Sequence, residues 1–282
     1  MFEEIEEIQE KEEIGQNEFD EEKQKVINKV DRRLYRHERE NRFLWKRSED
    51  YSVVDDVFDM PTLMVINKLI NDKIIKTMKS SIASGKESKV YLAVDDSHNF
   101  LAVKIYLQAN TEFKKRMQYI DGDPRFSHIK KGSRNLIATW AKKEFKNLKT
   151  AYNNGVNVPV PYEVRRNVLV MDFIGDDEGN PCSNLVYSES VTSKDYDEII
   201  LQASKLYQKA ELVHADLSEY NIFKCRDGRI MFFDFGSSVN IRHPNSKQFL
   251  IRDIININGF FVKRGIQVLN NDLAIQEIIG GK

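Results

Sequence analysis

The sequence has few of the residues that mark secreted or membrane proteins. Only two of the 282 residues are cysteines, Cys182 and Cys225, and their separation matches no metal-binding or redox motif. So low a number is typical of a reducing compartment. No apolar run reaches the roughly 18 residues that a membrane-spanning helix needs, and the acidic N-terminus is the opposite of a secretory signal. We therefore expect a soluble intracellular protein that has no membrane partner.

An excess of charge of one sign is also missing. The 43 Lys and Arg residues almost balance the 44 Asp and Glu residues, which leaves a net charge of -1. The chain as a whole is therefore not biased toward nucleic acids or membranes, and any such contact must come from a local patch. A hydrophobic content of 41% and a charged content of 31% are typical of a soluble globular protein of one large domain or two small ones.

Two local patches of opposite charge lie at the N-terminus. Residues 3–22 contain eleven acidic residues and one lysine, which favours a solvated, disordered tail. Residues 31–47 contain seven basic and three acidic residues, interleaved with apolar and aromatic side chains such as Tyr35, Phe43 and Trp45. Such a segment could bind RNA phosphates and stack on bases, or it could be a helix that is solvated on one face and docked by its aromatic residues. We assign residues 1–50 to a charged, partly disordered N-terminal extension.

The usual glycine motifs for phosphate binding are absent. The P-loop pattern G-x-x-x-x-G-K-[ST] fails around Gly85 because position 80 is Ser and position 87 is Glu, and the G-x-G-x-x-G of protein kinases does not occur. What remains is a short loop, Ser84 to Lys89, that leads into a strand predicted over residues 90–94. In this loop we expect Ser84, Lys86 and backbone amides to contact phosphates.

The sequence does contain the two halves of a phosphoryl-transfer site. In the kinase pattern H-R-D-x-x-x-x-N the Asp takes the proton of the attacking hydroxyl and the Asn holds Mg²⁺. Asp216 and Asn221 have this spacing, with Ala215 in place of Arg, and Asp234 begins an Asp-Phe-Gly motif. The apolar runs 222–224 and 230–233 flank an Asp-Gly turn and predict a hairpin that brings these motifs together. The alternative is three unrelated acidic residues on a surface hairpin.

A lysine and a glutamate in apolar surroundings form a second pattern. Lys104 lies in a predicted strand, residues 101–106, where burial of its charge is unfavourable unless it meets an anion. A helix predicted over residues 138–152 places Glu144 on one stripe with Trp140, Leu148 and Ala151. We expect Glu144 to pair with Lys104, as the corresponding residues do in kinases. The alternative is two solvated charges that never meet.

The remaining elements complete a kinase-like order. We predict a helix over residues 61–78, strands over 158–164 and 168–173, and a helix over 194–213 whose last turn delivers His214. The second of these strands would lead into a hinge in which backbone groups of Asp172 and Ile174 bind the adenine edge. The polar, basic connection 107–135 is long, which indicates a mobile or functional loop. Only 46 residues follow Gly236, too few for a peptide-binding helical lobe, and no Ala-Pro-Glu motif closes an activation segment.

Together these motifs resemble the RIO family of atypical kinases, and within it the Rio-one subfamily. The resemblance covers roughly residues 55–265 and is carried by the following segments: Ser84–Glu87, Leu101–Tyr106, Thr139–Glu144, Val168–Gly175, Leu212–Asn221 and Phe249–Asp253. The residues before Tyr51 are too few and too polar for the winged-helix domain of the second subfamily. The Asp-Phe-Gly at position 234 departs from the Rio-one pattern, which usually lacks the Phe-Gly.

The resemblance implies an α+β, two-lobed kinase-like fold with an antiparallel sheet in the N-lobe and a truncated helical C-lobe. The N-lobe would span residues 51–175 and the C-lobe residues 176–282. It also implies a cytoplasmic enzyme that uses ATP and Mg²⁺ to phosphorylate serine or acts mainly as an ATPase, with an Asp234 that can itself be phosphorylated. Its implied partner is the maturing small ribosomal subunit and its rRNA.

The resemblance assigns a role to each candidate site residue. Lys104, oriented by Glu144, would hold the α- and β-phosphates, Asn221 and Asp234 would hold Mg²⁺, and Asp216 would orient the acceptor. Two rival functions remain: a small-molecule kinase of the aminoglycoside or choline type, and a non-catalytic ribosome-binding scaffold. The first requires a large acceptor lobe after the metal-binding Asp, and the second predicts loss of the charged residues, all of which are present.

Overall fold

The structure is a computed structural model that describes residues 58–85, 87–107, 119, 123 and 133–280. The chain separates into two units, Met1–Ser52 and Val53–Lys282, and all described residues belong to the second. The N-terminal extension, Lys86 and most of the 107–135 connection therefore lie outside the described residues.

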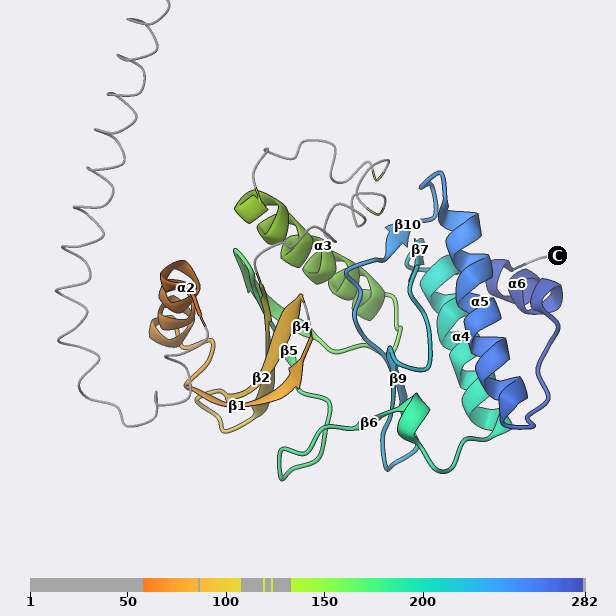
Figure 1. The fold of residues 1–282 in the computed structure, drawn as a ribbon, viewed down its shortest axis with the longest axis horizontal. Helices are drawn as coiled ribbons and strands as arrows, with labels where there is room; N and C mark the ends of the chain where they lie inside the picture. The colour runs from red at the N-terminus through yellow and green to blue at the C-terminus, as the bar shows by residue number, and fades with distance from the viewer. Residues whose placement is uncertain (1–57, 86, 108–118, 120–122, 124–132, 281–282) are drawn as a thin grey trace, which may run out of the picture. The chain divides into compact units, whose positions relative to one another are not determined.

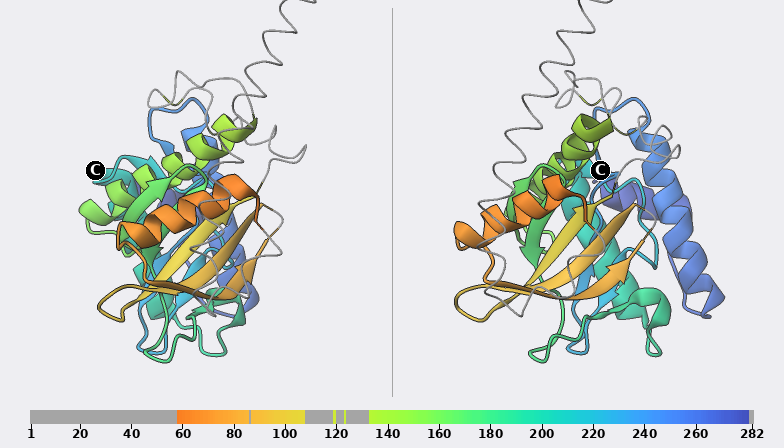
Figure 2. Two further views of the ribbon diagram at one scale, coloured as in Figure 1. Left: turned by 90° about the vertical axis from the view of Figure 1, so that its left-hand side faces the viewer. Right: turned by 60° about the vertical axis from the view of Figure 1, so that its left-hand side comes forward.

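The first half of the described chain forms a five-stranded antiparallel sheet with the strand order β1-β2-β3-β5-β4. The helices α2 (Met60–Asn71) and α3 (Ser133–Asn153) lie on opposite sides of this sheet (Figure 1). Figure 2 shows α2 in orange across the outer face. The strands are β1 (Thr77–Ser84), β2 (Ser88–Val94), β3 (Phe100–Tyr106), β4 (Pro161–Arg165) and β5 (Val168–Asp172).

The strand predicted over residues 101–106 is confirmed as β3, and its side chains alternate between the two faces of the sheet. Leu101, Val103 and Ile105 pack into the core cluster that contains the buried face of α2. Lys104 and Tyr106 point to the opposite face, where Tyr106 joins the cluster that contains α3 and the C-terminal helices. Because successive side chains of a strand alternate between its faces, burial of the apolar residues under α2 turns Lys104 toward α3.

The helix predicted over residues 61–78 is too long. It begins as expected, with the Asp59 side chain accepting a hydrogen bond from the amide of Thr62 at 3.1 Å. It ends at Asn71, because Lys73 adopts a left-handed φ of 58° and Ile74 caps the carbonyl of Leu69. The following residues form β1, which pairs with β2. For the eight residues of β1, pairing with β2 is therefore more favourable than continuation of the helix, although the apolar residues keep a helical period.

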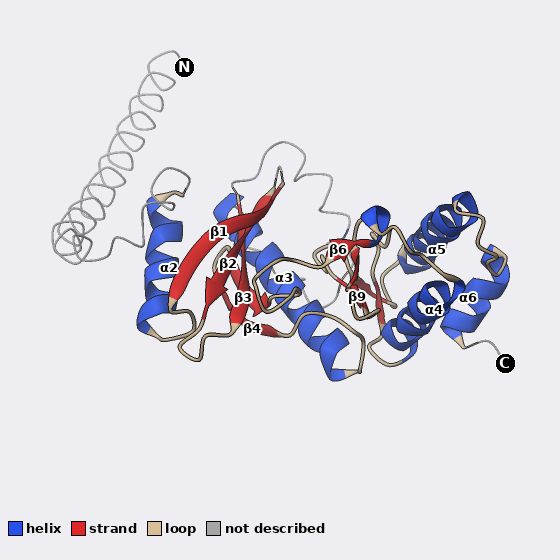
Figure 3. Cartoon of the chain, turned by 90° about the horizontal axis from the view of Figure 1, so that it is seen from below, coloured by secondary structure: helices blue, strands red, loops and turns tan. Residues whose placement is uncertain are grey.

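The second half of the described chain combines short strands with three helices. Figure 3 shows the helices gathered beyond β6 and β9, and their apolar faces share one core cluster with α3. Among the described residues no helix is both long and apolar enough to cross a membrane. The elements are β6 (Ser183–Asn184), the 3-10 helix η4 (Leu185–Tyr187), α4 (Ser193–Gln208), β7 (Leu212–Val213), β8 (Ile222–Lys224), β9 (Ile230–Phe232), β10 (Val239–Asn240), α5 (Ser246–Lys263) and α6 (Asn271–Ile279).

The helix predicted over residues 194–213 is also too long. A capping box between Thr192 and Asp195 starts α4, as such residues do at helix N-termini. The helix ends at Gln208, and Glu211, with a φ of 51°, redirects the chain into β7. His214 therefore follows a strand that pairs with β10, and not the last turn of a helix.

The two cysteines form a disulfide bond, which stands against the inference of a reducing compartment, since disulfides are rare there. Cys182 precedes β6 and Cys225 follows β8, and these two strands pair antiparallel to each other. The bond therefore links the segment after the hinge to the hairpin between the two catalytic motifs. A separation of 43 residues resembles no known cysteine motif, so only the strand pairing reveals that the two residues are neighbours.

Candidate active site

Lys104 lies between two carboxylates. Its ammonium contacts both oxygens of Glu144 at 2.9 Å and Oδ1 of Asp234 at 3.0 Å. Lys104 and Glu144 are buried, with 6% and 1% of their surfaces exposed. The Tyr106 hydroxyl also donates to Glu144. The predicted pair of Lys104 and Glu144 is confirmed, and Asp234 joins it from 130 residues further along the chain.

Burial and charge act in opposite directions in this cluster. Burial opposes the charge of Lys104, but Asp234 and Glu144 outweigh it and raise the pKa of the ammonium. Burial, together with the nearby charge of Asp234, raises the pKa of Glu144 to about 7 despite the attraction of Lys104. Lys104 therefore stays charged. Its ammonium can bind the phosphates of a nucleotide in addition to the two carboxylates.

The hairpin β8–β9 brings the catalytic motifs together as predicted. The Asn221 amide donates to the backbone oxygen of Asp216 at 2.7 Å and to its carboxylate at 3.2 Å. The carbonyl of Asn221 accepts from the amide of Phe233 at 3.1 Å. Since Phe233 immediately precedes Asp234, these bonds place Asp216, Asn221 and Asp234 at one end of the hairpin.

The side chain of His214 packs against this end of the hairpin. Its Nε2 donates to the carbonyl of Phe233 at 3.0 Å, and its ring packs against Phe235 with 4.8 Å between the ring centroids. Burial lowers the pKa of His214 to about 4, so the imidazole is neutral at physiological pH. Its structural contacts and its neutrality indicate that it orients the Asp-Phe-Gly segment.

Two residues of α3 that the sequence analysis missed hold the segment after Asp234. Lys143 donates to the carbonyls of Gly236, at 2.8 Å, and Ser238. Asn147 donates to the carbonyls of Phe235 and Ser238, both at 2.9 Å. Both residues are fully buried. Lys143 and Asn147 are four residues apart and so share one face of α3, but nothing in the sequence shows that their partners are backbone carbonyls.

The catalytic loop is held by α5 in a similar way. The carboxylate of Asp253 accepts from the amide of Ala215 at 2.8 Å and from that of Leu217 at 3.0 Å. Burial raises the pKa of Asp253 to about 8. The guanidinium of Arg252 donates to the carbonyl of Ala215. Both residues belong to the Phe249–Asp253 segment, which the sequence analysis recognised without assigning a role to either.

The predicted hinge is partly engaged within the chain. The amide of Asp172 donates to the carbonyl of Val160 at 2.9 Å, and the carbonyl of Ile174 accepts from the amide of Cys182 at 2.9 Å. The side chain of Asp172 accepts from the amide of Val160 and the hydroxyl of Tyr162. These bonds fix the hinge segment against β4 and β6 and already engage the amide of Asp172 and the carbonyl of Ile174.

Ser84 lies at the tip of the β1–β2 hairpin. It is exposed, and the neighbouring turn is closed by the amide of Gly85, which donates to the carbonyl of Ser88 at 2.9 Å. Along β2 the register places Val90 opposite Lys104. The hairpin therefore runs from the lysine to a tip that carries Ser84, whereas Lys86 lies outside the described residues.

The donors at the end of the hairpin fit Mg²⁺ bound together with a nucleotide. Among the described residues no three His, Cys, Asp or Glu side chains cluster into a preformed metal site. Mg²⁺ commonly takes one or two protein oxygens and completes its shell with phosphates and water. Asn221 supplies an amide oxygen, and Asp234 supplies a carboxylate that keeps 45% of its side chain exposed.

The sequence matches one protein family. The RIO domain matches residues 89–274 of the chain. The RIO-type serine/threonine-protein kinases Rio1 of Methanocaldococcus jannaschii and Haloferax volcanii are 40% and 36% identical to it, each over 84% of this chain and over 79% and 81% of their own lengths. The serine/threonine-protein kinase RIO3 of Caenorhabditis elegans is 35% identical over 86% of this chain and 48% of its own length.

The fold matches solved structures of the same kind. The Rio2 kinase of Chaetomium thermophilum in an ADP/Mg²⁺-phosphoaspartate complex superposes with a TM-score of 0.58 and 21% sequence identity. The match covers 78% of this chain and 67% of that one. It confirms the predicted α+β kinase-like fold.

Proposed function

The chain belongs to the RIO family of serine/threonine kinases, an enzyme family, and from this premise we propose that it transfers the γ-phosphoryl group of Mg-ATP at the site around Lys104, Asp216 and Asp234. The observation that carries the proposal is the contact of Lys104 with both Glu144 and Asp234. A buried lysine balanced between a helical glutamate and the metal-binding aspartate has the arrangement that kinases use to hold a nucleotide.

Each residue then has a role that follows from its contacts. Lys104, held by Glu144, binds the α- and β-phosphates, and Asp216 accepts the proton of the acceptor hydroxyl. Asn221 and Asp234 would hold Mg²⁺, which would neutralise charge on the transferred group. The carbonyl of Asp172 and the amide of Ile174 bind adenine, and Ser84, at the tip of the hairpin, contacts the phosphates together with Lys86. Positioning and electrostatics account for most of the acceleration.

Asp234 is a candidate acceptor of the γ-phosphoryl group. Its carboxylate is half exposed beside the proposed phosphate site, so we propose that it can itself accept the γ-phosphoryl group before water removes it. The phosphoaspartate complex of the Rio2 kinase of Chaetomium thermophilum supports this route. ATP hydrolysis would then accompany serine phosphorylation.

We also propose that the protein belongs to the Rio-one subfamily and acts in the cytoplasm in late maturation of the small ribosomal subunit. The two archaeal relatives carry the Rio1 name, which supports the subfamily. The basic segment 31–47, with its aromatic residues, supports contact with ribosomal RNA.

The test is Mg-ATP turnover by the purified full chain, with and without small ribosomal subunits that carry immature rRNA. We expect turnover by the isolated chain and a change in its rate with the particles. The Asp216→Ala variant should associate with immature rRNA in a pull-down. A chain that binds these particles but shows no turnover would be a scaffold, and the catalytic proposal would be wrong.

A further inference from the structure

One side of α5 is exposed beside the proposed catalytic loop. Figure 1 shows α5 in front of α4, and the buried residues of the two helices share one core cluster. On the other side of α5, Ile255 and Val262 keep 49% and 58% of their surfaces exposed. Residues seven apart lie on the same side of a helix, so these two side chains form an exposed apolar strip.

Basic side chains extend along the same side of α5. Arg252 and Lys263 are exposed, and Gly259 lies between them at spacings of seven and four residues, which put all three on one line of the helix. The one acidic residue of α5, Asp253, is buried. The exposed side of the helix is therefore positively charged. We call it the α5 face, and it consists of Arg252, Ile255, Gly259, Val262 and Lys263.

The middle of the α5 face is open. A Cβ at Gly259 would meet no atom within 4 Å. A chain segment that lies along the face can therefore approach the helix backbone at this position, with Ile255 and Val262 on one side of it. Open space at the centre, apolar side chains beside it and a cation at each end are features that fit an extended peptide.

The α5 face adjoins the catalytic loop at its Arg252 end. Arg252 donates to the carbonyl of Ala215, the residue before Asp216. One turn further along α5, Asn256 donates to the carbonyl of Leu217, the residue after Asp216, at 3.4 Å. A segment that lies on the α5 face would therefore pass Asp216 at this end, and its other end would lie at Lys263.

On the basis of the proposed function, we propose that the α5 face docks the serine-containing segment of a protein acceptor, and that this segment is acidic. The serine oxygen forms its bond to the γ-phosphorus as the bond from that phosphorus to the β–γ bridging oxygen breaks, ADP leaves, and Asp216 takes the hydroxyl proton. The cations of the face select acidic residues, since charges of opposite sign set the register of an interface. A nucleic acid would meet the same charge, but its phosphates and bases gain little from aliphatic side chains such as Ile255 and Val262.

The length of the α5 face sets the spacing of the acidic residues. Eleven residues of helix at about 1.5 Å each put Lys263 about 16 Å along α5 from Arg252. An extended segment covers this distance in about five residues at roughly 3.3 Å each. We therefore expect acidic residues about five positions from the acceptor serine, with an apolar residue between them that packs against Ile255 and Val262.

The test is phosphorylation of synthetic peptides by the full chain, together with Mg-ATP turnover in the absence of peptide. Each peptide has one serine, a leucine three positions away, and at positions five and six either two glutamates or two lysines. Both kinds are made with these residues before and after the serine, because either chain direction fits the helix. In one direction we expect kcat/KM to be at least about fivefold higher for the glutamate peptide than for the lysine peptide.

Lys263→Glu should reverse this preference, because the variant attracts the lysine peptide and repels the glutamate peptide. Mg-ATP turnover without peptide should stay within about twofold of wild type, since no nucleotide contact changes. Lys209→Glu is the matched control: Lys209 is exposed and also stands at a helix end, as the C-cap of α4. It should leave the preference as in the wild type.

Gly259→Leu tests the site without a change of charge. A Cβ at this position meets no atom within 4 Å, and leucine favours a helix more than glycine does, so the variant should melt no lower than the wild type. The leucine side chain would lie in the path of the peptide and should lower kcat/KM for the glutamate peptide at least about fivefold. Mg-ATP turnover without peptide should again be unchanged.

The outcomes separate this inference from the proposed function. A wild-type chain without Mg-ATP turnover overturns both. A wild type that hydrolyses ATP but phosphorylates neither peptide, or phosphorylates both equally, overturns the inference alone. So does a Lys263→Glu variant with the wild-type preference. If Gly259→Leu changes the sedimentation of the chain, or Lys263→Glu its affinity for an RNA oligonucleotide, while peptide phosphorylation stays at the wild-type level, the α5 face binds a second copy or RNA and the inference is also wrong.

Discussion

At the scale of single residues, the site is organised by a lysine that neutralises more than one anion. Lys104 contacts two carboxylates, of which Glu144 is buried and Asp234 is half exposed. Buried ions are retained in proteins only where they are paired and hydrogen-bonded. The half-exposed Asp234 is therefore the anion that would be accessible to Mg²⁺ in the proposed site, whereas Glu144 keeps the ammonium in place.

Replacement of Lys104 by methionine should affect both stability and binding. Removal of one partner of a buried ion pair costs about 3–5 kcal/mol, and we expect a value toward the lower end because Glu144, with its pKa of about 7, can take up a proton. ATP affinity should fall with it. Urea unfolding and calorimetric titration with Mg-ATP measure the two effects.

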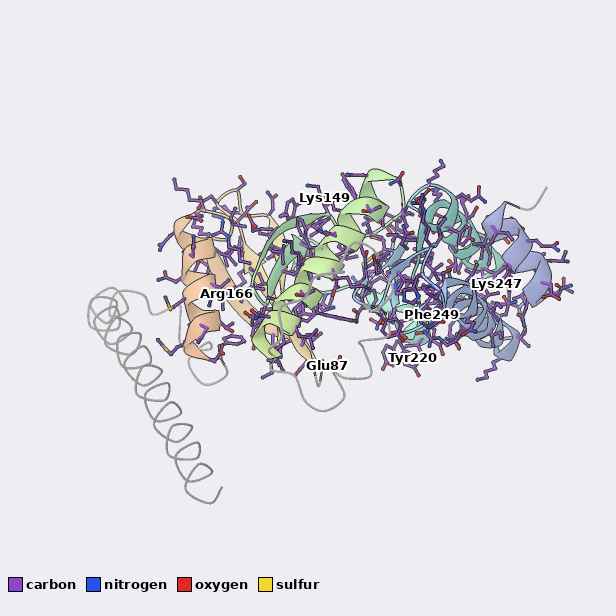
Figure 4. All side chains as sticks on the ribbon, turned by 90° about the horizontal axis from the view of Figure 1, so that it is seen from above. Glu87, Lys149, Arg166, Tyr220, Lys247 and Phe249 are labelled. Carbon is purple, nitrogen blue, oxygen red and sulfur yellow. A yellow bond between two sulfur atoms is a disulfide. The ribbon has the colours of Figure 1, made fainter. Side chains whose placement is uncertain are left out.

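Lys149→Met is the control for this prediction. Lys149 lies on the exposed face of α3 and is labelled in Figure 4. Its replacement should change stability by less than about 0.5 kcal/mol. Equal losses from the two variants would contradict the assigned role of Lys104.

The buried carboxyls also predict how stability depends on pH. Glu144 and Asp253 have folded-state pKa values of about 7 and about 8, above their unfolded values, so the folded state binds more protons than the unfolded state. The imidazole of His214 is neutral in the folded state throughout this range, and with an unfolded pKa of 6.5 it loses its proton in the unfolded state by about pH 7.5, which offsets only a small part of the change. The nucleotide-free protein should therefore lose about 2 kcal/mol of stability as pH rises from about 6.5 to 8.

Asp253→Asn isolates the larger contribution to this loss. The variant should be less stable overall, since an amide cannot accept from both backbone amides, but its stability should vary less with pH in the same window. Urea unfolding at several pH values measures the slope. A slope as steep as that of the wild type would show that Asp253 is not the titrating group.

The sequence could predict residues whose partners are also side chains, and it could not predict the others. Lys104 and Glu144 were found because each is a charge in an apolar pattern and one requires the other. Lys143, Asn147 and Arg252 bond to backbone carbonyls. Every residue has a carbonyl, so a residue that binds one leaves no complementary signal elsewhere in the sequence.

At the scale of elements, α3 and the segment after Asp234 form one unit. A Cβ on Gly236 would lie 2.6 Å from Nε1 of Trp140 on α3, closer than packed atoms approach. Lys143 and Asn147 bond the same segment. The position of α3 therefore sets where Asp234 stands relative to Lys104.

Gly236→Ala should test this coupling. The added methyl group must displace the segment or α3, which we expect to cost about 1–3 kcal/mol and to weaken Mg-ATP binding. Gly259→Ala is the control, because a Cβ at that position in α5 meets nothing within 4 Å. It should stabilise the helix by about 0.5–1 kcal/mol. Thermal melting of both variants, with and without Mg-ATP, makes the comparison, and unchanged binding by Gly236→Ala would refute the coupling.

The errors in the predicted elements have a common cause. The apolar period of residues 61–78 and 194–213 continues past the true helix ends, since strand β1 and strand β7 carry apolar residues at compatible positions. Both helices end near residues with left-handed φ, Lys73 and Glu211, neither of which is glycine. A lysine or a glutamate gives no local sign of such a conformation, which the sheet pairings that follow impose.

At the scale of the whole described unit, one covalent bond joins the hinge side to the catalytic hairpin. The Cys182–Cys225 disulfide closes a chain segment of 43 residues that includes α4 and the catalytic loop. Loss of a bond that closes a loop of this length is expected to cost about 2–4 kcal/mol. Reduction should therefore lower the unfolding midpoint in urea. The Cys182→Ser/Cys225→Ser double variant should show the same midpoint with and without reductant, and a wild type insensitive to reductant would contradict the prediction.

The central claim is that Lys104, Glu144, Asp216, Asn221 and Asp234 form one phosphoryl-transfer site. Its most direct test is a parallel measurement of Mg-ATP binding and turnover by Asp216→Ala. The account predicts a dissociation constant within about threefold of wild type and a kcat lowered at least about 100-fold, because Asp216 acts on the acceptor and not on the nucleotide. Undiminished turnover, or a loss of nucleotide binding as large as that of Lys104→Met, would contradict it.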